Sequence, residues 1–253
     1  MRDLPIVVIT GARGGIGRAL VAELAARGGL RIVGVSRQAA ELGDLPLALA
    51  VQADCSTPEG ASDIFAQCKE TLGAAPALLA HCVGSTLIAP MHRTTNEQWQ
   101  AVMRTNLDSA AFMLRGWVEG LREGNLSELA DDFAAVFVSS VVSRIGVAQH
   151  EAIAAAKGGV EALVRSAAAT YAPQGLRVNA VAPGMTETPM TAGMLKLPAM
   201  REGAGKQYPL GGVQTAQQVA QTMAWLLSEQ ALRITGQVIA VDGGFTTVRP
   251  LVR

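Results

Sequence analysis

Short runs of β-branched residues alternate with alanine-rich stretches along the whole chain, and this alternation restricts the fold more than any other feature. Residues 6–9 read Ile-Val-Val-Ile, the length of a buried strand, and residues 16–27 then carry leucines at helical spacing. Strands that alternate with helices of about 10–15 residues form βαβ units. The sequence therefore predicts an α/β protein with a doubly wound parallel sheet of about seven strands, covered by helices on both faces.

No linker or internal repeat divides the chain, so we expect a single domain over residues 1–253. Residues 124–132 are polar and are predicted to form a loop. Residues 185–212 are rich in Pro, Gly and Met and are predicted to be a substrate-loop insertion, because long loops in compact domains are usually functional. The predicted strands are 6–9, 31–35, 47–51, 77–83, 134–139, 176–181 and 237–241. Helices are predicted at 16–27, 106–121, 149–171 and 215–227. Two more helices are predicted, one that begins at Thr57-Pro58 and one that begins near Thr95, with Gln98 as its capping-box partner.

The composition excludes several classes of protein. Apolar residues make up 49% of the 253 residues and charged residues 17%, which excludes a disordered chain and permits a large core. The 21 Lys and Arg balance the 21 Asp and Glu, which argues against nucleic acid as a partner, because phosphate binding needs a basic excess. No apolar stretch approaches the roughly 18 residues of a membrane span. Three cysteines and three histidines without paired spacing predict no metal site and indicate reduced thiols in the cytoplasm.

A cluster of glycines stands between the first predicted strand and the first predicted helix. The chain reads TGARGGIG from Thr10 to Gly17, a Gly-x3-Gly-x-Gly spacing. Glycines at such a junction let the backbone approach a pyrophosphate, while the helix N-terminus offers unpaired N–H groups and the positive end of its dipole. An ordinary tight turn is the alternative, but the position directly after the first strand favours a dinucleotide site.

The end of the second predicted strand bears on which nucleotide binds. An Asp or Glu there would hold the ribose hydroxyls of NAD. The strand instead ends in Ser36 and Arg37, and no carboxylate follows until Glu41. Arg37 can pair with the 2′-phosphate of NADP, assisted by Arg13 of the glycine cluster, so NADP is favoured over NAD. The alternative for Arg37 is a solvated surface charge.

These residues and others resemble the short-chain dehydrogenase/reductase family, and in particular its 3-oxoacyl-carrier-protein reductases, over nearly the whole chain. The resemblance implies a Rossmann fold. Residues 81–84 (HCVG) stand where the family has Asn-Asn-Ala-Gly, and residues 235–237 with 241–244 are similar to its C-terminal signature. Asp54 matches the family residue that contacts adenine, and Pro183-Gly184 with Thr188 matches the motif beside the nicotinamide. The predicted cofactor-binding residues are Gly11, Arg13, Gly14, Gly15, Ile16, Gly17, Ser36, Arg37, Asp54, Cys55, Gly84, Lys157, Pro183, Gly184 and Thr188.

The resemblance also implies a catalytic tetrad. In the family a hydride moves between C4 of the nicotinamide and a carbonyl or alcohol carbon. A tyrosine transfers the proton, a serine holds the substrate oxygen, a lysine lowers the tyrosine pKa and binds the nicotinamide ribose, and an asparagine anchors a relaying water. Ser140, Lys157 and Asn106 match three of these residues, but the tyrosine position, 13 residues after the serine and 4 before the lysine, holds Ile153.

Neither tyrosine of the chain replaces the missing one. Tyr171 follows Lys157 by more than three helical turns, about 20 Å at 1.5 Å per residue. Tyr208 lies in the predicted insertion, where it is expected to be a substrate-loop or packing residue. An isoleucine cannot exchange a proton, and the loss of a positioned acid typically costs about 10²–10⁴ in rate.

Three other groups could supply the proton. His150 precedes position 153 by three residues, so on a continuous helix it shares a face with Ile153 and Lys157, and histidine exchanges protons near neutral pH. Glu151 is directed less well toward the helix face that carries Ile153 and Lys157. Lys157 itself could act through water if burial lowers its pKa. The alternative for His150 is a polar residue that starts the helix.

Three functions stay open. The first is an NADP-dependent oxidoreductase with an atypical active site, acting on a small-molecule carbonyl or alcohol such as a 3-oxoacyl thioester. The second is a non-catalytic nucleotide-binding pseudoenzyme, or the silent subunit of a hetero-oligomer with an active paralogue. The third is a lyase or isomerase that uses NADP structurally. The resemblance further implies a homotetramer built on the helix at 149–171, a neighbouring helix and the last strand. Small residues on the helix at 149–171 permit close contact between helices. Helix propensity alone is the alternative explanation for these small residues.

Overall fold

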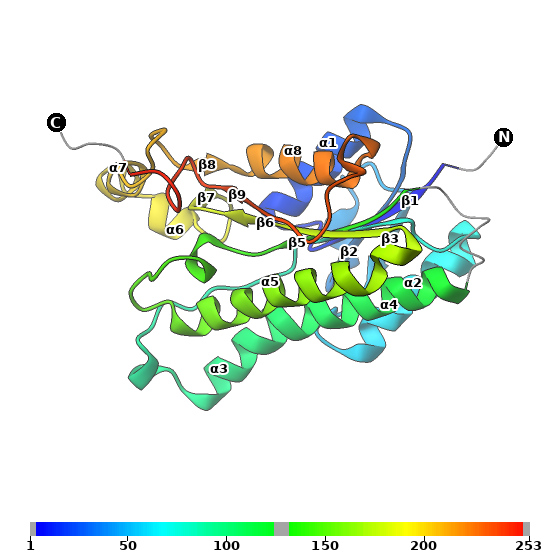
Figure 1. The fold of residues 1–253 in the computed structure, drawn as a ribbon, viewed down its shortest axis with the longest axis horizontal. Coiled ribbons are helices and arrows are strands. Elements are labelled where there is room, and N and C mark those ends of the chain that lie inside the picture. Colours follow the sequence, from blue (N-terminus) through cyan, green and yellow to red (C-terminus); the bar gives the residue numbers. More distant parts are fainter. Residues whose placement is uncertain (1–3, 124–131, 250–253) are drawn as a thin grey trace.

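The computed structural model describes residues 4–123 and 132–249. Within these residues seven strands form one sheet, and every neighbouring pair in it is parallel (Figure 1). This arrangement confirms the predicted α/β fold with a doubly wound sheet. In spatial order the strands are β3 (Leu49–Gln52), β2 (Arg31–Ser36), β1 (Ile6–Thr10), β4 (Leu78–His81), β5 (Phe133–Val138), β6 (Leu176–Pro183) and β9 (Val238–Val241).

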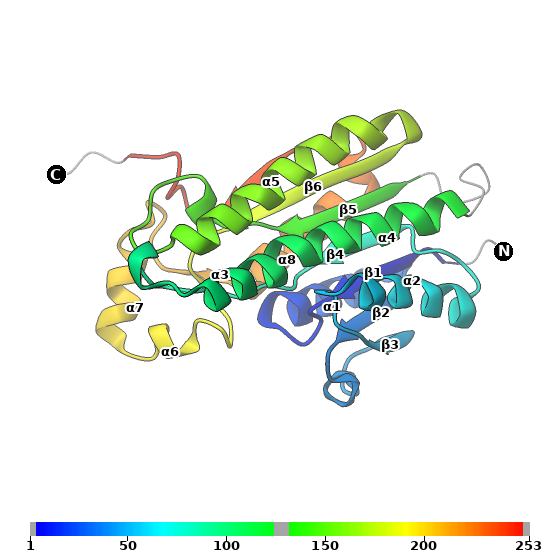
Figure 2. The same cartoon turned by 90° about the horizontal axis from the view of Figure 1, so that it is seen from below.

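Helices cover both faces of this sheet. One face carries α1 (Gly15–Arg27) and α8 (Ala216–Leu227), which pack against each other (Figure 1). The other face carries α2 (Pro58–Leu72), α4 (Ser109–Glu123) and α5 (Glu151–Tyr171), with α3 (Asn96–Met103) leading into α4 (Figure 2). Strands β1 and β6 are buried along their whole length, as expected for inner strands of a parallel sheet that helices cover on both faces.

The helix starts follow the capping signals in the sequence. Thr57 caps α2 by accepting a hydrogen bond from the Gly60 amide, with Pro58 in the first turn. Thr95 forms a capping box with Gln98 at the start of α3, and Thr215 forms one with Gln218 at the start of α8. These side chains satisfy backbone amides that have no partner inside the helix.

Two helix boundaries differ from the prediction for physical reasons. The helix predicted at 106–121 is continuous with α3 through a π-turn over Arg104–Asp108. In this turn the Asn106 amide donates to the Val102 carbonyl oxygen at 2.9 Å and so competes for a backbone acceptor. Helix α5 begins two residues later than predicted, because Gln149 has φ +65°, outside the helical region.

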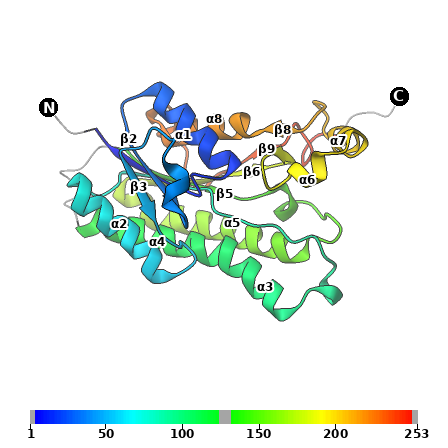
Figure 3. The same cartoon turned by 180° about the vertical axis from the view of Figure 1, so that it is seen from behind.

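The predicted insertion is largely structured. It contains α6 (Ala192–Leu195) and α7 (Pro198–Gly205), and its ends are joined where β7 (Thr186–Glu187) pairs with β8 (Gln214–Thr215). Both helices lie beyond the end of the sheet where α1 and α5 begin (Figure 3). Of the predicted loop at 124–132, residues 124–131 lie outside the described residues. Among the helices that the structure describes, none is both long and apolar enough to cross a membrane.

Candidate active site

The glycine cluster lies where the strand order reverses, between β1 and β4, the usual ligand position in a doubly wound sheet. Gly11 directly follows β1 with φ +64°, and a Cβ on it would lie 3.1 Å from the backbone of Cys82, which follows β4. A Cβ on Gly17 would overlap the carbonyl oxygen of Gly11. A side chain at either position would therefore push the turn open, which explains both glycines sterically.

The same turn contacts the base of the insertion. A Cβ on Gly15 would lie 2.8 Å from the Thr188 side chain, so the insertion packs directly on the glycine cluster. Gly14 occupies the N-cap of α1, and no described side chain caps this helix. Its first amides are therefore oriented as a site for an anion such as a pyrophosphate.

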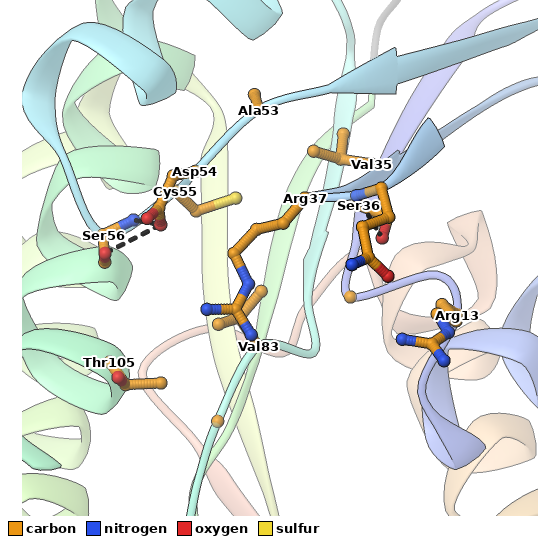
Figure 4. A pocket seen from close by; sticks show the side chains of 13 residues that line it. Arg13, Val35, Ser36, Arg37, Ala53, Asp54, Cys55, Ser56, Val83 and Thr105 are labelled. Atoms are coloured by element: carbon orange, nitrogen blue, oxygen red, sulfur yellow. Dashed lines mark hydrogen bonds between the residues drawn. The ribbon is translucent and has the colours of Figure 1, made fainter. Parts of the chain in front are cut away.

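A pocket of about 320 Å³ opens beside the glycine cluster at the ends of β1, β2 and β3 (Figure 4). Arg37 extends between Ser36 on one side and Asp54 on the other, and Arg13 lies on the glycine side (Figure 4). Seven of the predicted cofactor residues line the pocket: Gly11, Arg13, Ser36, Arg37, Asp54, Cys55 and Gly84. Six lining residues were not predicted: Val35, Gln38, Ala53, Ser56, Val83 and Thr105.

Asp54 is ionised at the rim of this pocket. Partial burial raises its pKa, but hydrogen bonds from the Ser56 amide at 2.9 Å and hydroxyl at 2.7 Å, with the Arg37 and Arg104 guanidinium groups, bring the pKa of Asp54 below its usual value. The pocket thus presents a fixed hydrogen-bond acceptor close to arginine donors. With its apolar Val35 and Val83, it fits the adenosine end of a dinucleotide.

Gly84 links this pocket to two buried polar side chains. A Cβ on Gly84 would lie 3.0 Å from Asn106 Oδ1 and 3.3 Å from Lys157 Nζ, so glycine leaves room between them. Lys157 is 6% exposed, and its Nζ donates to the Val138 carbonyl oxygen at 2.8 Å. Burial lowers the pKa of Lys157 to about 8, and the Cys82 thiol opposes the shift.

The π-turn fixes the orientation of Asn106. Besides the bond to Val102, its amide nitrogen donates to the Ser85 hydroxyl at 3.1 Å, and its oxygen accepts from the Ser85 backbone amide at 3.2 Å. Asn106 is fully buried. Three hydrogen bonds therefore hold its side chain against the segment that follows β4, next to Gly84.

Ser140 lies near the start of the segment that joins β5 to α5, and Ile153 lies in the first turn of α5. Ser140 is half-buried directly before a single 3₁₀ turn, Val141–Ser143, and its Oγ accepts from the Val142 amide at 3.4 Å. Ile153 lies on α5, one turn before Lys157, and is 4% exposed. It belongs to a small apolar cluster with Val102, Ala152 and Ala156.

His150 immediately precedes α5 rather than lying within it. Its Nδ1 is 2.8 Å from the Ala148 carbonyl oxygen, which can only accept, so Nδ1 carries a hydrogen and Nε2 is the other ring position for proton exchange. Its side chain does not cap the helix. The expected alignment of His150 with Ile153 required both residues to lie on one continuous helix. Because His150 lies outside α5, this requirement is not met.

His81 forms a buried network that the sequence did not single out. Ser109 Oγ donates to the Thr105 carbonyl oxygen at 2.6 Å and therefore accepts from His81 Nε2 at 3.0 Å. His81 Nδ1 then accepts from the Thr10 hydroxyl at 2.8 Å. This neutral histidine ties the ends of β1 and β4 to the π-turn beside Asn106. The sequence placed His81 at the end of a buried strand and in the segment 81–84 but gave it no role, because its partners come from distant segments.

Tyr208 connects the insertion to the segment after β6. Its hydroxyl accepts from the Met185 amide at 2.6 Å, and a Cβ on Gly184 would lie 2.7 Å from its ring. Tyr208 is 7% exposed, and burial raises its pKa. The tyrosine thus fixes the backbone beside Pro183 and Gly184, in keeping with a packing residue rather than a proton donor.

Comparisons with known proteins agree with this architecture. A family model described as enoyl-(acyl carrier protein) reductase matches residues 11–246. A cis-4-hydroxycyclohexanecarboxylate dehydrogenase from Sinomonas cyclohexanicum is 34% identical, covering 96% of this chain and 97% of its own. An oxidoreductase of the short-chain dehydrogenase/reductase family from Burkholderia thailandensis superposes with a TM-score of 0.84 at 29% identity, over 96% of this chain and 93% of its own. The chain belongs to the short-chain dehydrogenase/reductase family.

Further relatives in this family are also dehydrogenases and reductases. The 3-oxoacyl-[acyl-carrier-protein] reductase of Vibrio cholerae is 30% identical over 94% of this chain and 96% of its own. An aldohexose dehydrogenase from Thermoplasma acidophilum shares the fold, with a TM-score of 0.89 at 24% identity over 100% of this chain and 97% of its own. Membership in this family supports oxidoreductase activity in general and a nicotinamide cofactor.

Proposed function

We propose that the chain catalyses hydride transfer between the nicotinamide of NADP and a carbonyl or alcohol carbon, at an active site that lacks the family's tyrosine. The proposal rests on one juxtaposition: Gly84 lines the nucleotide pocket and also adjoins the buried Lys157 and Asn106. Bound NADPH would supply the hydride. The glycine cluster, Arg13 and Arg37 would hold its adenosine half, and Lys157 would hold the nicotinamide ribose.

Each retained side chain has a distinct role in this proposal. The Ser140 hydroxyl donates a hydrogen bond to the substrate oxygen. The Lys157 ammonium adds positive charge to a buried site, where an electrostatic interaction is stronger than in water. Asn106 keeps the π-turn and the segment after β4 in register. Pro183, Gly184 and Thr188 border the nicotinamide side, with Tyr208 fixing their backbone.

The proton must come from a group other than residue 153. Lys157 is one candidate, since with a pKa of about 8 it exchanges protons more readily near neutral pH than an ordinary lysine. His150 is the second, with Nε2 as its exchanging atom. The exposed Glu151, which follows His150, is the third. Mutants distinguish these three candidate acids, because His150→Ala abolishes activity only if the histidine is the acid.

The experiment is a steady-state assay of NADPH oxidation over a panel of ketones and 3-oxoacyl thioesters, with NADPH binding measured in parallel. We expect slow turnover that Ser140→Ala lowers further. NADPH that binds tightly but is consumed with no carbonyl would contradict the proposal.

Arg37 is expected to determine the preference for NADP. Arg37→Ala should raise the Kd of NADPH about 10–100-fold, because a hydrogen-bonded ion pair to phosphate is worth about 1.5–3 kcal/mol. The Kd of NADH, which lacks the 2′-phosphate, should stay within about twofold. Fluorescence titration of both nucleotides measures the two constants, with the exposed Arg165→Ala as the control. Equal weakening of both nucleotides would assign Arg37 to the adenine instead.

A second candidate function is a non-catalytic nucleotide-binding subunit. The observation that favours it is Ile153 itself, which is buried among apolar side chains beside Lys157. Such a protein would bind NADP, transfer no hydride, and act as the silent partner of an active paralogue. Co-purification with that paralogue would support this function, and turnover by the isolated chain would exclude it.

We propose that the chain forms a homotetramer through α5, the neighbouring α4 and the edge strand β9. The exposed face of α5 is lined by small residues, with Ala155 and Ala162 exposed and open space at the Cβ position of Gly158. Gly158→Arg is therefore expected to halve the assembly mass measured by light scattering, because an arginine cannot fit between closely packed helices. Gly193→Arg, a control on α6 with equally open space, should leave the mass unchanged. An unchanged mass in Gly158→Arg would move the interface elsewhere.

The insertion at 185–212 is proposed to cover a small-molecule substrate. Met190, Leu197 and Met200 are exposed on it, which suits an adaptable apolar binding surface. A 3-oxoacyl thioester and a cyclic secondary alcohol both fit this chemistry and correspond to the names of the relatives. We propose a cytoplasmic location, supported by the free thiols of the chain.

A further inference from the structure

Glu161 is a buried carboxylate that none of the roles above uses. It lies on α5, one turn after Lys157, and is 6% exposed. Its Oε1 accepts from the hydroxyls of Ser139 at 2.9 Å and Ser143 at 2.7 Å, and from Arg144 Nε at 3.3 Å. A carboxylate removed from water is stable only when it is paired and hydrogen-bonded in this way.

The partners of Glu161 bracket Ser140 in the sequence. Ser139 directly precedes it, and Ser143 Oγ lies 2.5 Å from the Ser140 carbonyl oxygen as well as beside Glu161. Arg144 ends the 3₁₀ turn that follows. The Ser139 hydroxyl also lies 3.4 Å from the Lys157 carbonyl oxygen. One carboxylate thus joins the end of β5, the turn after Ser140 and the helix that carries Lys157.

Within the described residues, the backbone hydrogen bonds of the turn do not reach α5. The Ser143 amide donates to the Ser140 carbonyl oxygen at 3.2 Å, and the Arg144 amide donates to the Val141 carbonyl oxygen at 3.0 Å, but both bonds are internal to the turn. The contact from the Val142 amide to Ser140 Oγ is long, at 3.4 Å. The bonds to Glu161 are therefore the polar contacts that hold the turn against the helix, beside the apolar contact of Val142 with the cluster that contains Ala152 and Ile153.

We propose that Glu161 is a positioning residue that places Ser140 Oγ relative to Lys157 for hydride transfer. The inference rests on the proposed function only for the role of Ser140 toward the substrate oxygen. In this proposal Glu161 contacts neither the substrate nor the cofactor. Its removal should therefore lower kcat and leave the Kd of NADPH unchanged.

Three variants test this role. Glu161→Leu removes every acceptor and should lower kcat about 10-fold or more, since bonds to a buried charge are among the stronger ones. Glu161→Gln keeps an amide oxygen for Ser139 and Ser143 and should retain kcat to within about threefold of wild type. Arg165→Met removes only an arginine that is 57% exposed and 3.7 Å from the second carboxylate oxygen, and should leave kcat unchanged.

A double-mutant cycle with Ser140→Ala separates positioning from general destabilisation. If Glu161 acts through Ser140, Glu161→Leu should cost less than about twofold in kcat once Ser140 is alanine. An equal loss in both backgrounds would overturn the proposal. Should Glu161→Leu not fold, Ser143→Ala takes its place in the same cycle with a smaller loss of kcat expected.

Hydrogen exchange keeps this test independent of turnover. The peptide that contains the amides of Ser143, Arg144 and Ile145 should exchange at least about 10-fold faster in Glu161→Leu, while α1 exchanges as in wild type. If wild-type protein transfers no hydride, the proposed function fails, and this exchange alone decides whether Glu161 holds the turn. Unchanged exchange there would overturn the inference.

Discussion

Replacing Ile153 with tyrosine is expected to raise kcat for carbonyl reduction about 10²–10⁴-fold, the usual contribution of a positioned general acid. Ile153 lies one turn before Lys157 on α5, and the lysine ammonium would lower the pKa of a tyrosine placed there. The ring must enter an apolar cluster that is already filled, which costs about 1–3 kcal/mol of stability. The measurement is kcat at saturating NADPH and ketone, with the melting temperature as a check on folding.

Ile153→Phe is the matched control, because it adds the same ring without a hydroxyl. It should carry the packing cost and show no gain in kcat. Equal activities of the tyrosine and phenylalanine variants would contradict the assignment of position 153 to the missing acid. Activity found only in the tyrosine variant, with none in wild type, would favour the non-catalytic function.

Acid is expected to destabilise the protein through His81. Burial, followed by the positive charge of Lys157, lowers the pKa of His81 to about 3, whereas in the unfolded chain a histidine titrates near 6.5. The unfolded state therefore binds a proton below pH 6.5 that the folded state does not. The stability that neutral His81 contributes is present above pH 6.5 and is lost as the pH falls toward 3, by about 5 kcal/mol in all.

The comparison uses urea unfolding of wild type and His81→Asn at pH 7 and pH 5, at one protein concentration. Between pH 7 and pH 5 the free energy of unfolding of wild type should fall by about 2 kcal/mol more than that of the variant. The loss is only part of the total, because the folded protein does not take up the proton on His81 until the pH approaches 3. The variant is expected to be less stable at pH 7, since Thr10 and Ser109 lose their partner. The same pH slope for both proteins would show that His81 protonates in the folded state.

The fold followed from local patterns that the structure confirms. Alternating strand and helix signals were sufficient for the sheet, and the capping residues Thr57, Thr95 and Thr215 mark true helix starts. The π-turn could not be predicted, because it depends on Asn106 bonding to Val102 and to a serine from another segment. The short helices of the insertion were also missed, since Pro and Gly obscure helical periodicity.

In the candidate site, too, some residues were predictable from the sequence and others were not. Gly11 and Arg37 were found from their positions at strand ends and Asp54 from the family resemblance, and all three line one pocket. Thr105 reaches that pocket from the π-turn, which no local pattern indicates. Glu161 reads in the sequence as an ordinary charged residue on a helix, and only tertiary contacts show that it is buried. The remaining roles, including the absence of a proton donor at Ile153, stay predictions.

The most direct test of the account is a single-turnover experiment with wild-type protein and NADPH that carries deuterium at both positions of C4. The enzyme, in excess over the labelled nucleotide, is mixed with the ketone panel, and the products are analysed by mass spectrometry. The account predicts deuterium on the carbinol carbon of at least one product, at a rate that Ser140→Ala lowers. Tight NADPH binding with no deuterium in any product would contradict it.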